Sequence, residues 1–522
     1  MMLYRRKKFF KPKRRPMRPK YRPYSRKRES NPILFVLAGM CFLAAIVLTV
    51  VNYTRFKSVG TVYPIGSTIA DIPVGGLSRK AAEARLREAY SIPIELRYRG
   101  ARVQINPEQL GFGWKMDETL HRADEQIPEA KWSAFLWGKR VEARPFNLPG
   151  QFSQDTSAIR MTLEQTFRNR YDQSPSASVP IVQSAHVLLG EPGFELSGID
   201  AAVESISQSL TSPTQRVVEL KVTETPALPV SWENLEIQLR QTIKLEGFDG
   251  LVELYLYDLQ DDRMMHFATR GGVDVPVDVA YSGASTVKIP IMVSTMRQLN
   301  EPIPATALNW MRSMIKDSLN PPADGLMKNY LDNHLGPLKV TEDMMTLGYE
   351  NTFMAGFFEP GSPLLRLFET PANLRRDVFL RPDTYNQTVP SEIGDLLKRI
   401  YRCAHNEGLE STLFDGQVTQ GECQIMIDNL LANKMGALIE VGVGVEGRVA
   451  HKHGWTSETD GLLHTISDVG IVYSPGGNYV LVIFMHSENQ LLFDTGNILF
   501  ARLSQSIYNA YNPTQQAIVY TD

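Results

Sequence analysis

The longest apolar run lies near the start of the chain. Residues 33–51 are nineteen consecutive uncharged positions, most of them aliphatic or aromatic. A helix rises about 1.5 Å per residue, so a run of this length crosses the hydrocarbon core of a bilayer. The pattern predicts a transmembrane helix over residues 33–52.

Shorter amphipathic segments follow the apolar run. Residues 71–90 have the pattern of a strand, a glycine turn and a helix, with Ser78 as the helix N-cap. Residues 194–210 repeat this plan and carry an apolar stripe at helical spacing, formed by Ile199, Val203, Ile206 and Leu210. We therefore predict a smaller α+β region over residues 60–226, after which 223–230 reads as a linker.

The remainder, residues 231–522, begins and ends with strand-like segments and is mostly helical between them. The strand segments are 251–259 and 263–269 at the start, and 450–456, 468–474 and 478–486 near the end. This order predicts one antiparallel sheet built from both ends of the domain, with helices packed on its faces. The fold class is therefore α+β.

The charge distribution changes the interpretation of the apolar run. Residues 1–30 hold 14 of the 55 Lys and Arg residues and a single acid, Glu29, which leaves 41 basic against 56 acidic side chains elsewhere. By the positive-inside rule, the tail 1–32 stays in the cytoplasm and the body of the chain lies outside the cell membrane. A cleaved signal peptide fits less well, because the basic part is long and no A-x-A-like site follows. We expect the tail to contact anionic lipid of the cytoplasmic membrane rather than nucleic acid.

The three cysteines are Cys41 in the apolar run, and Cys403 and Cys423 on neighbouring predicted helices. In an exported domain the latter two could form a disulfide or remain free thiols, and their spacing fits no metal motif. His451 and His453 flank Lys452, but no third ligand stands at a suggestive spacing. We predict no metal ion and no cofactor.

The segment 280–292 places Ser285 three positions before Lys288. On a helix this spacing puts a hydroxyl and an amine on one face. A neutral amine in that position can take the hydroxyl proton and create a nucleophile. The alternative is a solvent-facing lysine that happens to follow a serine.

Two further short motifs follow in chain order. Ser318-Leu319-Asn320 stands at a predicted turn between helices, and Lys452-His453-Gly454 opens a predicted strand. The order S-x-x-K, S-x-N and K-T/H-G is the signature set of class A β-lactamases and penicillin-binding proteins. Residues 231–522 therefore resemble this family of penicillin-recognising serine hydrolases.

The resemblance implies a role for each residue. Ser285 would be the acylated nucleophile, Lys288 the base, and Ser318 the donor of a proton to the leaving nitrogen. Asn320 would bind the substrate side-chain amide, Lys452 would attract the substrate carboxylate, and Gly454 would keep its strand slim beside the ligand. The backbone N–H groups of Ser285 and Trp455 would form the oxyanion hole.

The resemblance is incomplete at the residue that frees the acyl-enzyme. Class A enzymes use an Ω-loop glutamate to activate the hydrolytic water. Glu359 stands at the matching distance, but Phe357 and Pro363 replace the basic residue and the asparagine usual around it. Glu359 is therefore either this base or a surface acid; in the second case the domain would acylate and stall.

Residues 60–226 resemble the peptidoglycan-binding domain type that accompanies VanW-like and transpeptidase modules. The resemblance rests on VGGLSRKAAEARL, INPEQLGF and GEPGFELSGIDAAVESI; a spacer between membrane and hydrolase is the alternative.

Three functions follow from these expectations. The first is a membrane-anchored extracytoplasmic β-lactamase. The second is a D,D-peptidase, or penicillin-binding protein, acting on the stem peptides of peptidoglycan. The third is a non-catalytic cell-wall-binding protein.

Overall fold

The computed structural model describes residues 32–58, 62–128, 131–137, 144–407, 412–458 and 460–518. The predicted basic tail lies outside the described residues, apart from Pro32. The chain divides into two compact units. The N-terminal unit comprises residues up to Phe167 together with Gly198–Lys221, and the C-terminal unit comprises Arg168–Ser197 and Val222–Asp522.

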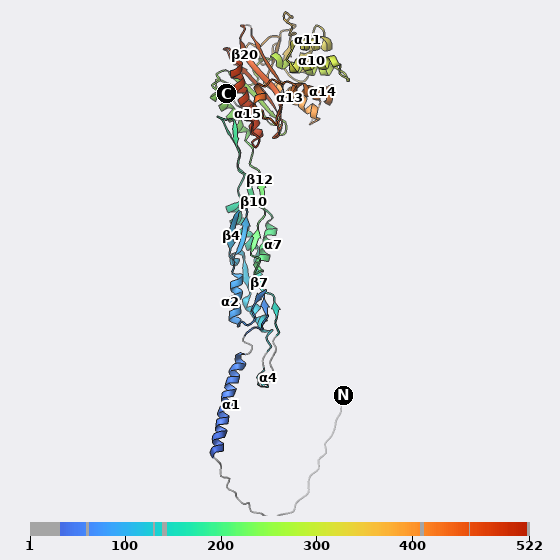
Figure 1. Ribbon diagram of the computed structural model, residues 1–522. Helices are drawn as coiled ribbons and strands as arrows, with labels where there is room; N and C mark the ends of the chain where they lie inside the picture. The colour runs from blue at the N-terminus through green and yellow to red at the C-terminus, as the bar shows by residue number, and fades with distance from the viewer. Residues whose placement is uncertain are drawn as a thin grey trace, which may run out of the picture. The chain divides into compact units, whose positions relative to one another are not determined.

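The apolar run forms one long helix, α1 (Pro32–Ser58), coloured dark blue in Figure 1. Its large apolar side chains are exposed along most of its length. By length and composition, α1 is able to cross a membrane, and a signal sequence near the N-terminus would pass the same test.

The N-terminal unit consists of short elements. Its helices are α2 (Arg79–Tyr90), α3 (Met116–Asp124), α4 (Trp132–Leu136), α5 (Thr156–Met161) and α7 (Ile199–Leu210), with a 3₁₀ turn at Pro107–Leu110 and a π-helical segment at Thr162–Arg168 that continues α5. Its strands are β1 (Thr68–Ile69), β2 (Ile72–Pro73), β3 (Ile94–Tyr98), β4 (Ala101–Ile105), β5 (Phe112–Trp114), β6 (Asn147–Leu148), β7 (Phe152–Gln154) and β11 (Val217–Glu219).

The strands that follow the two predicted helices, β3 after α2 and β11 after α7, share one sheet in the order β11-β3-β4. Ser78 caps α2 as expected, since its hydroxyl accepts the Ala81 N–H. On α7, the predicted stripe residues Val203, Ile206 and Leu210 are buried. The amphipathic pattern therefore specified both helices.

The C-terminal unit is built on a six-stranded sheet in the order β15-β14-β13-β21-β20-β19. Its strands are β13 (Leu251–Asp258), β14 (Met264–Arg270), β15 (Val273–Val275), β19 (Arg448–Ser457), β20 (Leu463–Tyr473) and β21 (Tyr479–His486). Every neighbouring pair is antiparallel, and β13 from the start of the domain pairs along its length with β21 from the end. The predicted α+β sheet is confirmed.

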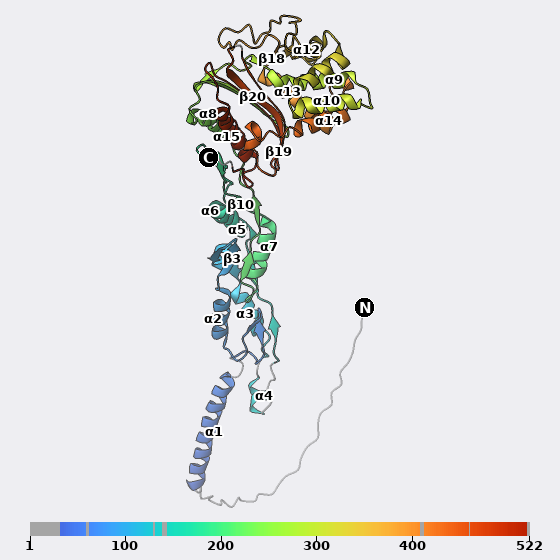
Figure 2. The same cartoon turned by 45° about the horizontal axis from the view of Figure 1, so that its top comes forward.

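Helices cover both faces of this sheet (Figure 2). Along β21, Val480, Val482 and Phe484 pack into one core cluster, while the alternate residues pack into another. Successive strand side chains point to opposite faces, so this alternation shows that both faces are buried. The second cluster includes α8 (Trp232–Leu245) and α15 (Phe493–Tyr511).

The first cluster joins the sheet to the helices of the middle of the domain. These are α9 (Lys288–Gln298), α10 (Ala305–Lys316), α11 (Asn320–Leu326), α12 (Gly336–Thr346), α13 (Pro390–His405) and α14 (Gln420–Leu431), with the short helical segments η3 (Ala284–Val287), η4 (Met327–Leu331, π-helical) and η5 (Phe414–Gly416). The short helix η6 (Leu438–Gly442) packs into the second cluster instead. A small sheet has the strand order β16 (Tyr281–Ser282), β18 (Asn386–Thr388) and β17 (Phe353–Met354). It joins the segment before α9 to two strands that lie between α12 and α13 in the sequence.

The extent of the C-terminal unit differs from the expected domain start at residue 231. It also includes α6 (Asn169–Tyr171), β8 (Val179–Ile181), β9 (His186–Leu188), β10 (Gly193–Leu196) and β12 (Val222–Thr225). The reason is packing over long sequence separations. Val187 joins the core cluster of α8 and α15, and its backbone N–H and C=O both bond the Gln516 side-chain amide.

Cys403 of α13 and Cys423 of α14 form a disulfide, with Cα atoms 5.9 Å apart. Of the two alternatives expected for these cysteines, a disulfide or free thiols, the structure contains the disulfide.

Candidate active site

Ser285 lies in the turn η3, immediately before α9 begins at Lys288. Its side chain is half-buried, whereas Lys288 is fully buried. Pro290 falls in the first turn of α9, where a backbone N–H has no helical acceptor. The proline after the lysine is therefore compatible with a helix that starts at this point.

The S-x-x-K motif at Ser285 and the S-x-N motif at Ser318 meet at the Lys288 amine. Lys288 Nζ donates to Ser285 Oγ at 3.0 Å and to the Ser318 backbone carbonyl at 2.6 Å. It also donates to Asn320 Oδ1 at 2.8 Å. Ser318 Oγ donates to Ser285 Oγ at 3.1 Å, so the two hydroxyls are in direct contact.

The third motif reaches the same group of atoms from β19. Lys452 Nζ donates to Ser318 Oγ at 2.9 Å, and Lys288 Nζ lies 3.4 Å from that oxygen. The Ser318 hydroxyl therefore stands between two amines and beside Ser285. We call Ser285, Lys288, Ser318, Asn320 and Lys452 the serine–lysine cluster.

Burial sets the electrostatics of this cluster. Loss of hydration lowers the pKa of Lys288 to about 8, against the opposing charge of Asp324. It lowers the pKa of Lys452 to about 7, with a further decrease from the nearby Lys288 charge. Two close amines lose their protons as a coupled pair, so one neutral amine is accessible near neutral pH.

Gly454 allows β19 to lie close to the turn that carries Ser285. A Cβ atom at Gly454 would stand 2.9 Å from Ser467 Oγ, 3.0 Å from Thr286 Cγ2 and 3.2 Å from the Gly283 carbonyl oxygen. Trp455 follows on the same strand and packs against Phe493. The expectation of a slim strand at Gly454 therefore has a geometric basis.

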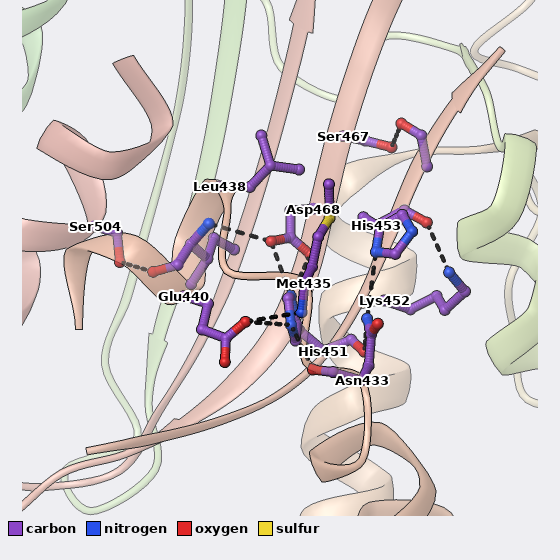
Figure 3. A network of polar contacts seen from close by, with 12 residues as sticks. Asn433, Met435, Leu438, Glu440, His451, Lys452, His453, Ser467, Asp468 and Ser504 are labelled. Carbon is purple, nitrogen blue, oxygen red and sulfur yellow. Dashed lines mark hydrogen bonds and ion pairs between the residues drawn. The ribbon is translucent and has the colours of Figure 1, made fainter. Parts of the chain in front are cut away.

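A buried polar network surrounds His451, the residue that precedes Lys452 on β19 (Figure 3). His451 Nδ1 lies 2.9 Å from Asp468 Oδ1, and both side chains are fully buried. Burial alone would lower the pKa of His451, but the charge and hydrogen bond of Asp468 outweigh it and raise that pKa. The network fixes the strand from which Lys452 projects.

The two histidines that flank Lys452 are not arranged around a common point. His451 pairs with Asp468, while His453 stacks on Trp455 with ring centroids 4.6 Å apart. Burial and the Lys452 charge lower the pKa of His453 to about 3. His453 therefore acts as a neutral aromatic ring beside the cluster.

The Glu359 side chain is exposed and pairs with Lys328. Its exposed carboxylate accepts a hydrogen bond from Lys328 Nζ at 2.7 Å, and this bond lowers the Glu359 pKa. The neighbouring Phe358 ring lies near the cluster, with its centroid 5.2 Å from Lys288 Nζ.

Sequence reasoning missed Asp324, on α11 six residues after Ser318. Its carboxylate accepts the backbone N–H groups of Phe358 and Glu359, each at 2.8 Å. Burial raises the Asp324 pKa despite these bonds. The sequence signal for this residue was an acid inside the segment NPPADGL, which follows the S-x-N motif. Its role as a hydrogen-bond acceptor could not be predicted, because the donors Phe358 and Glu359 lie in a loop distant in sequence.

One group of metal-binding residue types occurs among the described residues. Ligand atoms of Glu253, His266 and Asp278 lie within 4.8 Å of one another. Glu253 already accepts the Asp278 and Val279 backbone N–H groups, and its Oε1 lies 2.9 Å from His266 Nε2. We interpret this group as a hydrogen-bonded carboxylate that ties β13 to β14.

Comparisons with known proteins give a family match and several structural likenesses. A search of curated proteins found no match to the chain. The solved structure of PBP-A is 17% identical over 54% of this chain and 97% of its own, with a TM-score of 0.38. A class A beta-lactamase from Mycobacterium abscessus is 16% identical over 53% and 99%, with a TM-score of 0.38. An ancestral class A beta-lactamase is 20% identical over 53% and 99%, with a TM-score of 0.37.

The family match begins after Ser285 and Lys288 and includes Ser318, Asn320 and Lys452. It is to the model described as "Beta-lactamase enzyme family". Over residues 305–511 the chain therefore matches the beta-lactamase enzyme family, and its C-terminal unit is an α+β domain.

Proposed function

We propose that the C-terminal unit is an active-site serine hydrolase that opens the amide bond of β-lactams through an acyl-Ser285 intermediate. The observation that carries the proposal is the 3.0 Å hydrogen bond between Lys288 Nζ and Ser285 Oγ. It belongs to a cluster in which Lys288 is fully buried and its pKa is lowered to about 8. A neutral amine at that distance is a general base for the hydroxyl.

The chemical steps follow from the cluster. Lys288 takes the Ser285 proton as Oγ forms a bond to the carbonyl carbon of the substrate. The carbon–nitrogen bond then breaks, and Ser318 gives the nitrogen a proton, which Lys288 or Lys452 replaces. Water subsequently attacks the ester carbonyl, releases the acid and restores the Ser285 hydroxyl.

Binding roles are assigned to the remaining groups. Lys452, when protonated, attracts the substrate carboxylate, and the Asn320 amide binds the substrate side-chain amide. The backbone N–H groups of Ser285 and Trp455 stabilise the oxyanion; losing one such donor typically lowers the rate by about 10²–10³-fold. Gly454 leaves room for the substrate beside β19.

Hydrolysis of a chromogenic cephalosporin by the purified full chain tests this proposal. Ser285→Ala removes the nucleophile and should abolish turnover, while Ser313→Ala, at a half-buried serine of α10, should retain it. Equal turnover by wild type and Ser285→Ala, or no reaction of wild type with any β-lactam, would refute it.

The position of Glu359 favours a second candidate function. The Glu359 carboxylate is exposed and paired with Lys328, which suits an enzyme whose penicilloyl adduct persists. The corresponding physiological reaction is D,D-peptidase cleavage of peptidoglycan stem peptides. Release of D-alanine from a D-Ala-D-Ala peptide, together with a long-lived β-lactam adduct, would favour this candidate.

A non-catalytic wall-binding protein is the third alternative. The assembled serine–lysine cluster favours an enzyme over this alternative. Burying two amines around a hydroxyl costs free energy, and a protein that only binds the cell wall gains no stability from that arrangement. We also propose a single-pass topology with the N-terminus in the cytoplasm, and a cell-wall contact through residues 60–226. External protease should then digest the body of the chain in spheroplasts and leave the tail protected.

A further inference from the structure

The N-terminal unit contains a pocket of about 450 Å³. It lies where the end of α2, the turn at Pro107–Leu110 and β5 converge, and all of its lining residues belong to this unit. The volume lies within the range of small-molecule sites, about 300–1,000 Å³. The serine chemistry makes no use of this pocket.

Aromatic rings form its apolar side. Tyr90 and Phe112 are stacked nearly parallel, and Trp114 packs against the Tyr90 edge with centroids 4.5 Å apart. Trp114 is half-buried, so part of its indole remains accessible. Thr119 Oγ1 accepts the indole N–H at 3.1 Å, which fixes the ring orientation before any ligand arrives.

Polar side chains form the rim of the pocket. Asn106 and Glu108 are exposed at the start of the turn, and Arg87 is exposed near the end of α2. The rim charges are of opposite sign, and Arg87 also pairs with Glu83 at 2.9 Å. The rim therefore offers both hydrogen-bond donors and acceptors, and it does not favour a ligand of high net charge.

We propose that this pocket binds one or two rings of a neutral saccharide. A pyranose has an apolar face of C–H bonds, which matches an oriented indole, and a rim of hydroxyls, which matches the amide, carboxylate and guanidinium groups of Asn106, Glu108 and Arg87. A purely apolar peptide side chain would leave those polar groups unused. This inference rests on the proposed cell-wall contact of residues 60–226 and names the ligand class of that contact, which is separate from acyl transfer at Ser285.

Titration of the detergent-solubilised full chain tests the proposal. The probes are an N-acetylglucosamine tetrasaccharide, cellotetraose and a neutral tetrapeptide, followed by calorimetry and ligand-observed NMR. At least one saccharide should bind with a Kd on the order of 1 mM or tighter, and the peptide should not. Binding of neither saccharide, or of the peptide alone, would overturn the proposal.

Variants then locate the site. Asn106→Ala and Glu108→Ala change exposed residues, and Trp114→Phe keeps an aromatic ring in the pocket. Each should weaken saccharide binding at least about fivefold, corresponding to a hydrogen bond or stacking contact of about 1 kcal/mol. Glu118→Gln, at an exposed position of α3 outside the pocket, is the matched control and should bind like wild type. Unchanged binding in all three pocket variants would refute this location, and unaltered melting curves would exclude unfolding. The Ser285 reaction is followed separately, so failure here leaves the proposed hydrolase untouched.

Discussion

Glu359→Gln separates two descriptions of how the acyl-enzyme is released. The carboxylate is paired with Lys328 at the surface, and Asp324 holds the backbone N–H groups of Phe358 and Glu359. A Glu359 side chain that activated water at Ser285 would have to give up its ion pair with Lys328. We therefore expect Glu359 to take no part in deacylation.

The two descriptions predict effects of different size. Loss of a general base lowers a rate by about 10²–10⁴-fold, so a catalytic Glu359 would prolong the adduct by that factor when changed to glutamine. Loss of a surface ion pair changes little, and we expect an adduct lifetime within about fivefold of wild type.

Intact-protein mass spectrometry after mixing with penicillin measures the lifetime directly. The adduct should form on wild type and Glu359→Gln at similar rates, remain for similar times and be absent from Ser285→Ala. Glu342→Gln is a matched control, since Glu342 is an exposed acid paired with Lys339 at the same 2.7 Å distance. A hundredfold longer lifetime confined to Glu359→Gln would refute this reasoning.

Three further predictions concern the buried groups. The acylation rate should follow a bell-shaped pH profile with limbs near pH 7 and 8, because the Lys452 and Lys288 pKa values are lowered to about 7 and 8. The reactive form is the singly protonated pair with a neutral Lys288 and the proton on Lys452, so the rate rises as the pair loses its first proton and falls as it loses the second. Because Lys452 has the lower pKa, this form is the less populated of the two singly protonated forms. Stopped-flow rates independent of pH from 6 to 9 would contradict the prediction. Changing Cys403 and Cys423 together to serine should lower the free energy of unfolding by about 3 kcal/mol, the effect of opening a loop of this length, and denaturant titration measures it. Asp468→Ala leaves the fully buried His451 without its carboxylate and should cost about 3–5 kcal/mol in the same assay; a loss below about 1 kcal/mol would argue that the pair contributes little.

The sequence was sufficient for the parts of the site that depend on short-range geometry. Ser285 and Lys288 meet because a helical turn brings positions three apart together, and the structure retains this contact at 3.0 Å. The nearly continuous apolar runs of β13 and β21 are likewise typical of strands buried on both faces, as the structure has them. Chain order then indicated that Ser318 and Lys452 come from separate elements of the same domain.

The direction of Glu359 depends on interactions that no local pattern contains. Glu359-Pro360 stands at the distance expected of a deacylating base, yet the structure directs Phe358 toward Lys288 and Glu359 toward Lys328. That choice rests on Asp324, 34 and 35 positions before the two N–H groups it accepts. The inclusion of residues 168–197 in the C-terminal unit is similar, because Val187 bonds Gln516 across 329 positions.

Burial of the two lysines is the property on which the proposed chemistry depends, and it arises only from the assembled fold. Lys288 is covered because α9 begins beside the S-x-N turn, and Lys452 because Gly454 lets β19 approach the Ser285 turn. An exposed lysine would stay protonated near its usual pKa and could not deprotonate Ser285 at neutral pH. Substituting Gly454 should therefore impair acylation without removing any reacting group, because the strand and its amine would move away from the Ser318 hydroxyl.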